Sequence, residues 1–243
     1  MRSGNPALND SAFNVPSYGA ERMTINGTVR KTAALLVLAV MTAMWTWGQF
    51  MQTGDPSSVM LYVWVGAIGG FIVAMVTIFK KNFSPVTAPI YALLEGLVIG
   101  GLSAIFEAQF PGIVMQAVAL TFGTLACLLI AYRSGLIRAT ENFKMGVVAA
   151  TGGIALIYIA SIVLSFFGIR IPFIHEGGPT GILFSLFVVT IAALNLVLDF
   201  DFIESAAERD TPKYMEWYGA FGLIVTLIWL YLEILRLLGK SRR

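Results

Sequence analysis

The sequence predicts an all-α fold: a polytopic integral membrane protein built as a bundle of seven transmembrane helices. Only 12% of its 243 residues are charged and 57% are hydrophobic, whereas a soluble domain carries about 25% charged residues. The apolar residues gather in continuous blocks of roughly 20, the length with which an α-helix crosses a hydrocarbon core about 30 Å thick. Strands of a membrane β-barrel would instead be about 10 residues long with alternating polarity, so these blocks disfavour a barrel.

Glycine, proline and charged residues separate the apolar blocks and mark the limits of each predicted helix. The joints are mostly short, which predicts that helices adjacent in sequence pack antiparallel. The predicted spans are Thr32–Met51, Val59–Phe79, Val86–Ala108, Ile113–Tyr132, Met145–Gly168, Thr180–Ile203 and Trp217–Leu238.

Polar segments flank this predicted transmembrane domain, which covers residues 32–239. Residues 1–31 are rich in Asn, Ser, Gly and Pro, and we expect them to form a disordered tail. The first apolar block is longer than the 7–15 residues of a signal-peptide core, so it is read as a spanning helix. Residues 240–243 form a short basic tail.

The basic residues predict that the N-terminus is cytoplasmic, because short cytoplasmic loops are enriched in Lys and Arg. They concentrate in the N-terminal tail and in the second, fourth and sixth joints, whereas the fifth joint has only Arg170. Seven crossings would then place the C-terminus outside. The C-terminal basic residues contradict that placement and leave the seventh crossing open: Arg236, Lys240, Arg242 and Arg243.

Small residues recur at helical spacing in two of the predicted spans. Gly96, Gly100 and Ala104 share one face of the third span, and Gly66 and Gly70 share one face of the second. Such stripes let helix backbones approach closely in a membrane. We therefore expect these faces to be helix-packing surfaces.

Four acidic residues inside the apolar blocks are the main candidates for function: Glu95, Asp199, Asp201 and Glu233. An ionised side chain at the bilayer centre costs about 2.5–3.5 kcal/mol, so each must be neutral, paired or hydrated. At 1.5 Å per residue, Glu95 lies roughly 14 Å and Asp199 roughly 15 Å from helix ends on the predicted cytoplasmic side. These two carboxyl groups are therefore expected at one level.

The neighbours of these acids refine their expected roles. Asn195 precedes Asp199 by one helical turn and is positioned to hydrogen-bond to it, whereas Asp201 points about 200° around the helix. Glu233 lies near the opposite surface, where Arg236 at i+3 can form an ion pair with it.

Two buried carboxyl groups close together would share a proton and titrate as a unit. That chemistry suits a proton relay, a pH switch or a cation site, and calcium prefers carboxylate and carbonyl oxygens. If calcium binds, its ligands would be Asp199 with Glu95 or Glu233. No spacing establishes a metal site, and no cofactor is expected.

The sequence argues against an enzyme and against a nucleic-acid-binding protein. Its one histidine, His175, lies in a predicted loop, and no HExxH motif is present. Ser103 has no histidine within a span to activate it. The basic residues lie between the apolar blocks and do not form one basic face, so the expected partners are the lipid bilayer and other membrane proteins.

Three segments resemble, in order, the helices that characterise the Bax inhibitor-1 family, also called YccA-like or transmembrane Bax inhibitor motif proteins. They are PIYALLEGLVIGGLSAIFE, LNLVLDFDFIE and IWLYLEILRLLG. The resemblance, which is to the bacterial branch, implies residence in the bacterial inner membrane. It also implies a seven-helix bundle with a central last helix. Some members act as pH-sensitive calcium leak channels, and others regulate membrane proteins such as proteases.

Carried over to this chain, the resemblance implies an acidic pair of Asp199 and Glu233, with Glu95 lining the path. The chain departs from the family pattern in having Glu233 where aspartate is usual and Asp201 where a neutral polar residue is usual. It also has no Lys or Arg inside the first six predicted spans. By depth alone, Glu95 is the better neighbour of Asp199.

Three functions are therefore open. The first is a calcium or proton leak pathway gated by protonation of buried carboxylates. The second is a non-transporting regulator that binds another membrane protein through its glycine-lined faces. The third is a proton-coupled transporter, which would need broken helices. Gly152 and Gly153 are the residues that suggest such a break.

Overall fold

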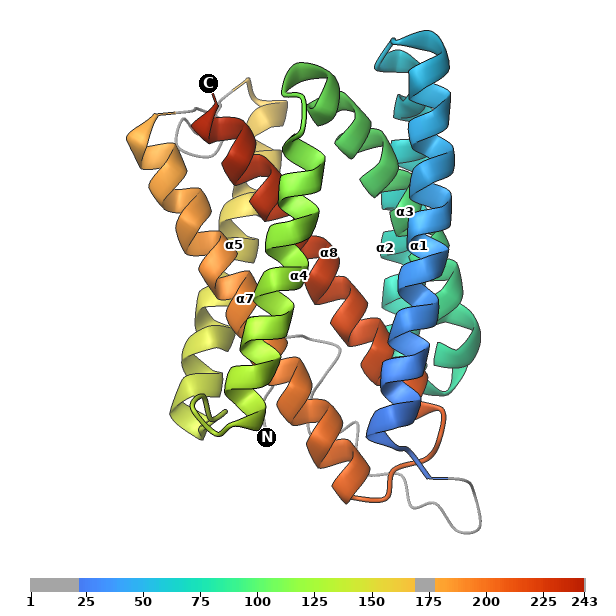
Figure 1. Ribbon diagram of the computed structural model, residues 1–243, viewed down its shortest axis with the longest axis vertical. Helices are drawn as coiled ribbons and strands as arrows, with labels where there is room; N and C mark the ends of the chain where they lie inside the picture. The colour runs from blue at the N-terminus through green and yellow to red at the C-terminus, as the bar shows by residue number, and fades with distance from the viewer. Residues whose placement is uncertain (1–21, 169–177, 243) are drawn as a thin grey trace.

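The computed structural model describes residues 22–168 and 178–242. Within these ranges, seven helices are long and apolar enough to span a membrane, as the sequence predicts (Figure 1). Arg170, His175, Arg243 and residues 1–21 lie outside the described residues. The helices are α1 (Ile25–Thr53), α2 (Ser57–Phe79), α3 (Ser84–Gln109), α4 (Ile113–Arg133), α5 (Glu141–Phe166), α7 (Pro179–Glu208) and α8 (Met215–Ser241), with a 3-10 turn η2 (Lys81–Phe83) before α3.

Several helices extend beyond their apolar blocks. α1 begins at Ile25 and not at Thr32, because the Thr24 side chain caps the helix by accepting a hydrogen bond from the Gly27 amide. The predicted polar tail therefore contributes its last residues to α1. In the same way, α5 begins at Glu141 behind the cap Thr140, which places Lys144 inside a helix.

α8 forms the centre of the bundle. Figure 1 shows it running diagonally between α4, α5 and α7 on one side and α1, α2 and α3 on the other. Within its most apolar stretch, 67% of α8 is buried inside the protein, against 17% for α4. α1, α3, α4 and α7 all pack on it, so the central last helix that the resemblance implies is present.

The third-helix glycines lie against α1. A Cβ atom built on Gly100 would lie 2.7 Å from the Ala43 Cα atom, and one on Gly96 would lie 3.0 Å from the Ala39 carbonyl carbon. Real Cβ atoms do not approach backbone atoms this closely, so only glycine permits the observed distance between α1 and α3.

The second-helix glycines lie against α3 on its other side. A Cβ atom on Gly66 would lie 2.5 Å from the Leu94 carbonyl oxygen. Ala104 is fully buried beside Phe50 and Val59, where α1, α2 and α3 meet. The two stripes of small residues therefore join α1, α2 and α3 into one tightly packed unit.

The two ends of the described chain lie on opposite faces of the bundle. The Met23 amide donates a hydrogen bond to the Thr211 carbonyl in the α7–α8 loop, and Arg22 pairs with Asp210 there. At the other end, Arg242 donates to the Pro111 carbonyl between α3 and α4. α8, with 27 residues, is about 40 Å long and is therefore long enough for a seventh crossing.

The basic residues that contradicted this crossing are bonded within the protein. Arg236 pairs with Glu233, and Arg242 also donates to the Gln116 side chain. Lys240 is buried and donates to the Ser185 hydroxyl and the Gly181 carbonyl at the start of α7. Because these charges are neutralised or solvated by the protein, they oppose translocation less than free basic residues would.

Replacing Gly100 by Ala tests the packing of α1 on α3. We expect Gly100→Ala to lower the free energy of unfolding by about 1–3 kcal/mol, because its new methyl group would meet the α1 backbone. The measurement is thermal unfolding of the purified protein in detergent. Gly123→Ala on α4 is the matched control, since nothing lies within 4 Å of its added Cβ atom. Equal unfolding temperatures for the two variants would contradict the prediction.

Candidate functional site

Asp199 is fully buried in α7 and belongs to the face that packs on the core of the bundle. Asn195, one turn earlier, is also buried, but its amide nitrogen donates to the Thr151 hydroxyl of α5 and to the Ile191 carbonyl, both at 2.8 Å. An amide has two N–H groups, and both are used. The prediction that Asn195 donates a hydrogen bond to Asp199 is therefore wrong, because both N–H groups of its amide already donate to Thr151 and Ile191.

Contacts between α7 and α8 fix the level of Asp199. Ile203 faces Gly219 near one end, and Ser185 bonds to Lys240 near the other. In this antiparallel register, Asp199 lies across from the turn around Leu223. Glu233 is ten residues further along α8, or roughly 15 Å. The register thus gives no support to direct pairing of Asp199 with Glu233, and that pair remains a prediction from the resemblance.

Contacts between α3 and α8 place Glu95 at the level of Asp199. The rings of Tyr91 and Phe221 have centroids 5.0 Å apart, and the Ser103 and Tyr231 hydroxyl groups are hydrogen-bonded at 2.6 Å. α3 therefore runs parallel to α8, and Glu95, one turn after Tyr91, lies beside the same turn of α8 as Asp199. The equal depth expected from the sequence is consistent with this register.

α8 nevertheless lies between the two carboxyl groups. Glu95 is half-buried; its side chain is seated against Gly70 of α2, where a Cβ atom would lie 2.8 Å from Oε1. This contact directs Glu95 toward α2, so its coupling to Asp199 remains a prediction.

Four aromatic rings fill the space at this level. Tyr91 contacts Phe221, Phe221 lies 6.3 Å from Tyr218, and Tyr218 lies 6.3 Å from Phe202, between ring centroids. The series runs from α3 across α8 to α7. The Tyr218 hydroxyl is buried and has no hydrogen-bond partner among the described residues. These rings form an apolar barrier between the Glu95 side and the Asp199 side.

Glu233 belongs to a separate polar cluster nearer the C-terminal end of α8. Its Oε1 atom accepts hydrogen bonds from the Tyr158 hydroxyl of α5 at 2.9 Å and from Arg236 at 2.7 Å. Arg236 also donates to the Tyr158 hydroxyl. The ion pair between Glu233 and Arg236 that the sequence predicts is thus present, and Glu233 is only 2% exposed.

Asp201 forms an ion pair that sequence reasoning missed. Its carboxylate lies 2.8 Å from the Lys144 ammonium group of α5, which is itself almost completely buried. Lys144 directly precedes the predicted span Met145–Gly168, so the absence of Lys and Arg from the first six predicted spans did not exclude a basic partner inside the bundle. The physical reason is that the cap at Thr140 starts α5 before its apolar block, so that Lys144 enters the bundle. The cap residue was the signal in the sequence.

A second missed ion pair fastens the start of α8. Lys31 of α1 pairs with the buried carboxylate of Glu216, which also accepts hydrogen bonds from the amide and hydroxyl of Thr24. The Lys31 ammonium group lies 5.4 Å from the centroid of the Trp217 ring. The sequence places Lys31 in the predicted polar tail, whereas it lies within α1 because that helix begins at Ile25.

A polar pocket opens beside Asp201. It has a volume of about 430 Å³ and lies between the α4–α5 connection and α7. Its charged lining residues are Arg133, Arg138, Asp201 and Glu204. Asp199 precedes Asp201 by two residues, which turns its side chain about 200° around the helix, so the pocket and the buried carboxyl group lie on opposite sides of α7.

No three His, Cys, Asp or Glu side chains gather as metal ligands within the described part of the chain. A calcium ion prefers six to eight oxygen ligands, so the acidic residues by themselves do not form a complete cage there. The arrangement suits carboxyl groups acting singly on a passing proton or partly hydrated cation.

Replacing Arg236 by Gln tests the cluster around Glu233. We expect Arg236→Gln to lower the free energy of unfolding by about 1.5–3 kcal/mol, the usual worth of a hydrogen bond to a charged group. Denaturant unfolding in detergent is the measurement, and the double variant with Glu233→Gln should recover part of the loss. Arg242→Gln, at the exposed end of the same helix, is the control with a smaller effect. An equal loss for both single variants would refute the assignment.

Comparison with protein families gives a match over nearly the whole chain. The model of the family described as Bax inhibitor 1 like matches residues 5–243. Comparisons with curated proteins and with solved structures give no significant match. The match covers all seven of the described helices that are long and apolar enough to span a membrane. This chain, a multi-pass membrane protein, belongs to the Bax inhibitor 1 like family.

Proposed function

We propose that this protein is a non-enzymatic, pH-sensitive leak pathway for calcium or protons, gated by protonation of Asp199. The observation that carries the proposal is the complete burial of the Asp199 carboxyl group on the face of α7 that packs on the core of the bundle. Membership of the Bax inhibitor 1 like family supports the membrane setting. We place the protein in a bacterial inner membrane with the N-terminus cytoplasmic, following its basic loops.

A proton on Asp199 changes the charge inside the bundle by one unit. The cost of a charged carboxylate at membrane depth is about 2.5–3.5 kcal/mol, and each 1.4 kcal/mol changes an equilibrium tenfold. Protonation therefore has enough energy to shift the balance between two packings of α7 on α8. The residues that would have to move are the aromatic rings of the barrier, with Phe202 and Tyr218 nearest to Asp199 in sequence register.

Glu233 has a different role in this proposal. Arg236 and Tyr158 already hold its Oε1 atom, so this carboxylate is neutralised within its own cluster. Its Oε2 atom is buried and has no hydrogen-bond partner among the described residues. The cluster offers one oxygen to a passing cation, with water completing its coordination.

The two other functions gain less support. The glycine-lined faces that suggested partner binding are occupied within the protein by packing of α1 and α2 on α3. A transporter with broken helices is also disfavoured, because Gly152 and Gly153 lie in the continuous helix α5. A regulatory partner would therefore have to bind another surface.

Flux through the purified protein in liposomes tests the proposal. We expect calcium or proton flux that changes about tenfold with pH, and a loss of this pH dependence in Asp199→Asn, since 1.4 kcal/mol of gating energy corresponds to tenfold. Fluorescent indicators inside the liposomes give the measurement. Asp55→Asn, an acid exposed in the α1–α2 loop, is the control and should behave as the wild type. Absent flux at every pH would refute a leak pathway.

A second comparison decides which carboxylate is coupled to Asp199. Because Glu95 shares the level of Asp199 and Glu233 does not, we expect Glu95→Gln to shift the pH at which flux is half-maximal. Glu233→Gln is expected to change the amount of flux without moving that midpoint. A midpoint shift in Glu233→Gln alone would favour the pair implied by the resemblance. The same liposome assay, repeated over a pH series, measures both variants.

A further inference from the structure

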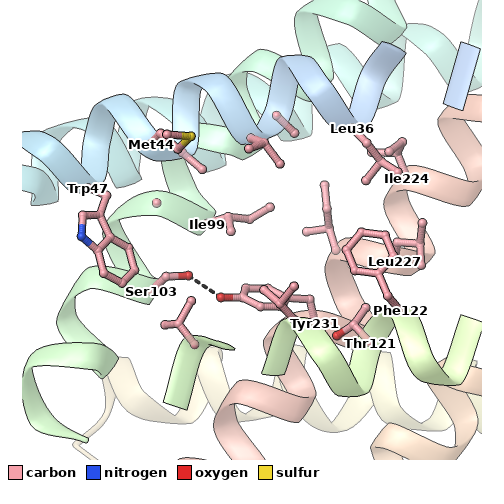
Figure 2. Close-up of a pocket in the computed structure, with 17 residues that line it drawn as sticks. Leu36, Met44, Trp47, Ile99, Ser103, Thr121, Phe122, Ile224, Leu227 and Tyr231 are labelled. Atoms are coloured by element: carbon pink, nitrogen blue, oxygen red, sulfur yellow. Dashed lines mark hydrogen bonds between the residues drawn. The ribbon is translucent and has the colours of Figure 1, made fainter. Parts of the chain in front are cut away.

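An apolar crevice lies between α1 and α4, with α3 and α8 as its floor. Figure 2 shows side chains from these four helices around an open space, including Leu36, Met44, Ile99 and Leu227. Its volume is about 310 Å³. None of the acidic residues of the proposed pathway lines this crevice, so it is separate from the ion path.

Hydroxyl groups in the crevice are satisfied by the protein. Ser103 and Tyr231 are hydrogen-bonded to each other at 2.6 Å (Figure 2). The Thr121 hydroxyl donates to the Ala117 carbonyl of its own helix at 2.7 Å. The crevice therefore offers no unpaired side-chain hydroxyl to a polar ligand, and an apolar space of this kind stays dry or binds an apolar molecule.

The crevice is continuous with the lipid-facing surface of the bundle. α1 and α4 each pack on α8, and the space between them is open at the side. At its mouth, Val40 and Met44 are 52% and 69% exposed, whereas Ile224 and Leu227 at the floor are 0% and 4% exposed. The mouth therefore faces the bilayer, and the floor is the buried central helix.

We propose that this crevice binds one acyl chain of a bilayer phospholipid. An apolar cavity of about 150 Å³ holds benzene, so twice that volume holds a chain segment of roughly a dozen carbons. An acyl chain is the apolar molecule that surrounds the mouth at this depth. Lodged in the crevice, it contacts Tyr231, two residues before Glu233, and fills the gap that α1 and α4 leave beside α8.

Photolabelling of the full-length protein in liposomes tests the site. The probe is a phosphatidylcholine with a diazirine in the middle of one acyl chain, and mass spectrometry maps the adducts. We expect adducts on Ile224, Leu227 or Ile228, although each is at most 8% exposed. Adducts confined to outward-facing side chains such as Leu61 would overturn the proposal, because the chain would then only coat the surface.

Matched variants on α1 separate the crevice from the general lipid surface. Val40 lines the crevice and Val37 does not, yet they are 52% and 58% exposed. We expect Val40→Trp to reduce α8 labelling about tenfold, which corresponds to 1.4 kcal/mol, and Val37→Trp to leave it unchanged. Equal labelling in both variants would refute the site.

A second pair keeps the test decisive if Val40→Trp unfolds. Met44 lines the crevice and Met41 does not, and both are well exposed, at 69% and 60%. Met44→Trp should reduce α8 labelling, and Met41→Trp should not. Thermal unfolding of each variant identifies the pair to be compared. The labelling readout does not depend on ion flux, so it stands or fails separately from the proposed leak activity.

Discussion

Burial of α8 at the centre of the bundle is the constraint on which the rest of the structure depends. A membrane interior supplies no water to a polar side chain, so the protein itself must supply the partners. Lys31 forms an ion pair with Glu216 at one end of α8. Near the other end, the Tyr158 hydroxyl is hydrogen-bonded to both Glu233 and Arg236. α1 and α5 are thus each oriented on α8 by a polar contact.

The same constraint divides the bundle into a tightly packed part and a looser one. Glycines bring α1, α2 and α3 to near backbone contact, which leaves little room for movement between them. α4 and α5 are the least buried spans, and α5 meets α7 through the contact of Lys144 with Asp201. A change of charge at Asp199 would therefore displace α7 more easily than α3, because the helices α4 and α5 beside α7 are less tightly packed than α1 and α2 beside α3.

Polar and apolar openings reach α7 and α8 from different directions. The polar pocket beside Asp201 opens at the end of α7, among the charges of the α4–α5 connection. The apolar crevice opens sideways between α1 and α4 and reaches the middle of α8 (Figure 2). Water or ions can thus act on α7 and lipid on α8, two helices that pack against each other.

The sequence by itself determined the fold class, the number of spans, the small-residue faces and the ion pair of Glu233 with Arg236. All of these depend on spacing within one helix, which periodicity shows directly. Only the tertiary structure decided that Asn195 donates a hydrogen bond to Thr151, that Lys144 forms an ion pair with Asp201, and that α8 lies between Glu95 and Asp199. Helical spacing gives the direction of a side chain around its own axis. Which neighbour stands in that direction depends on how all seven helices pack together.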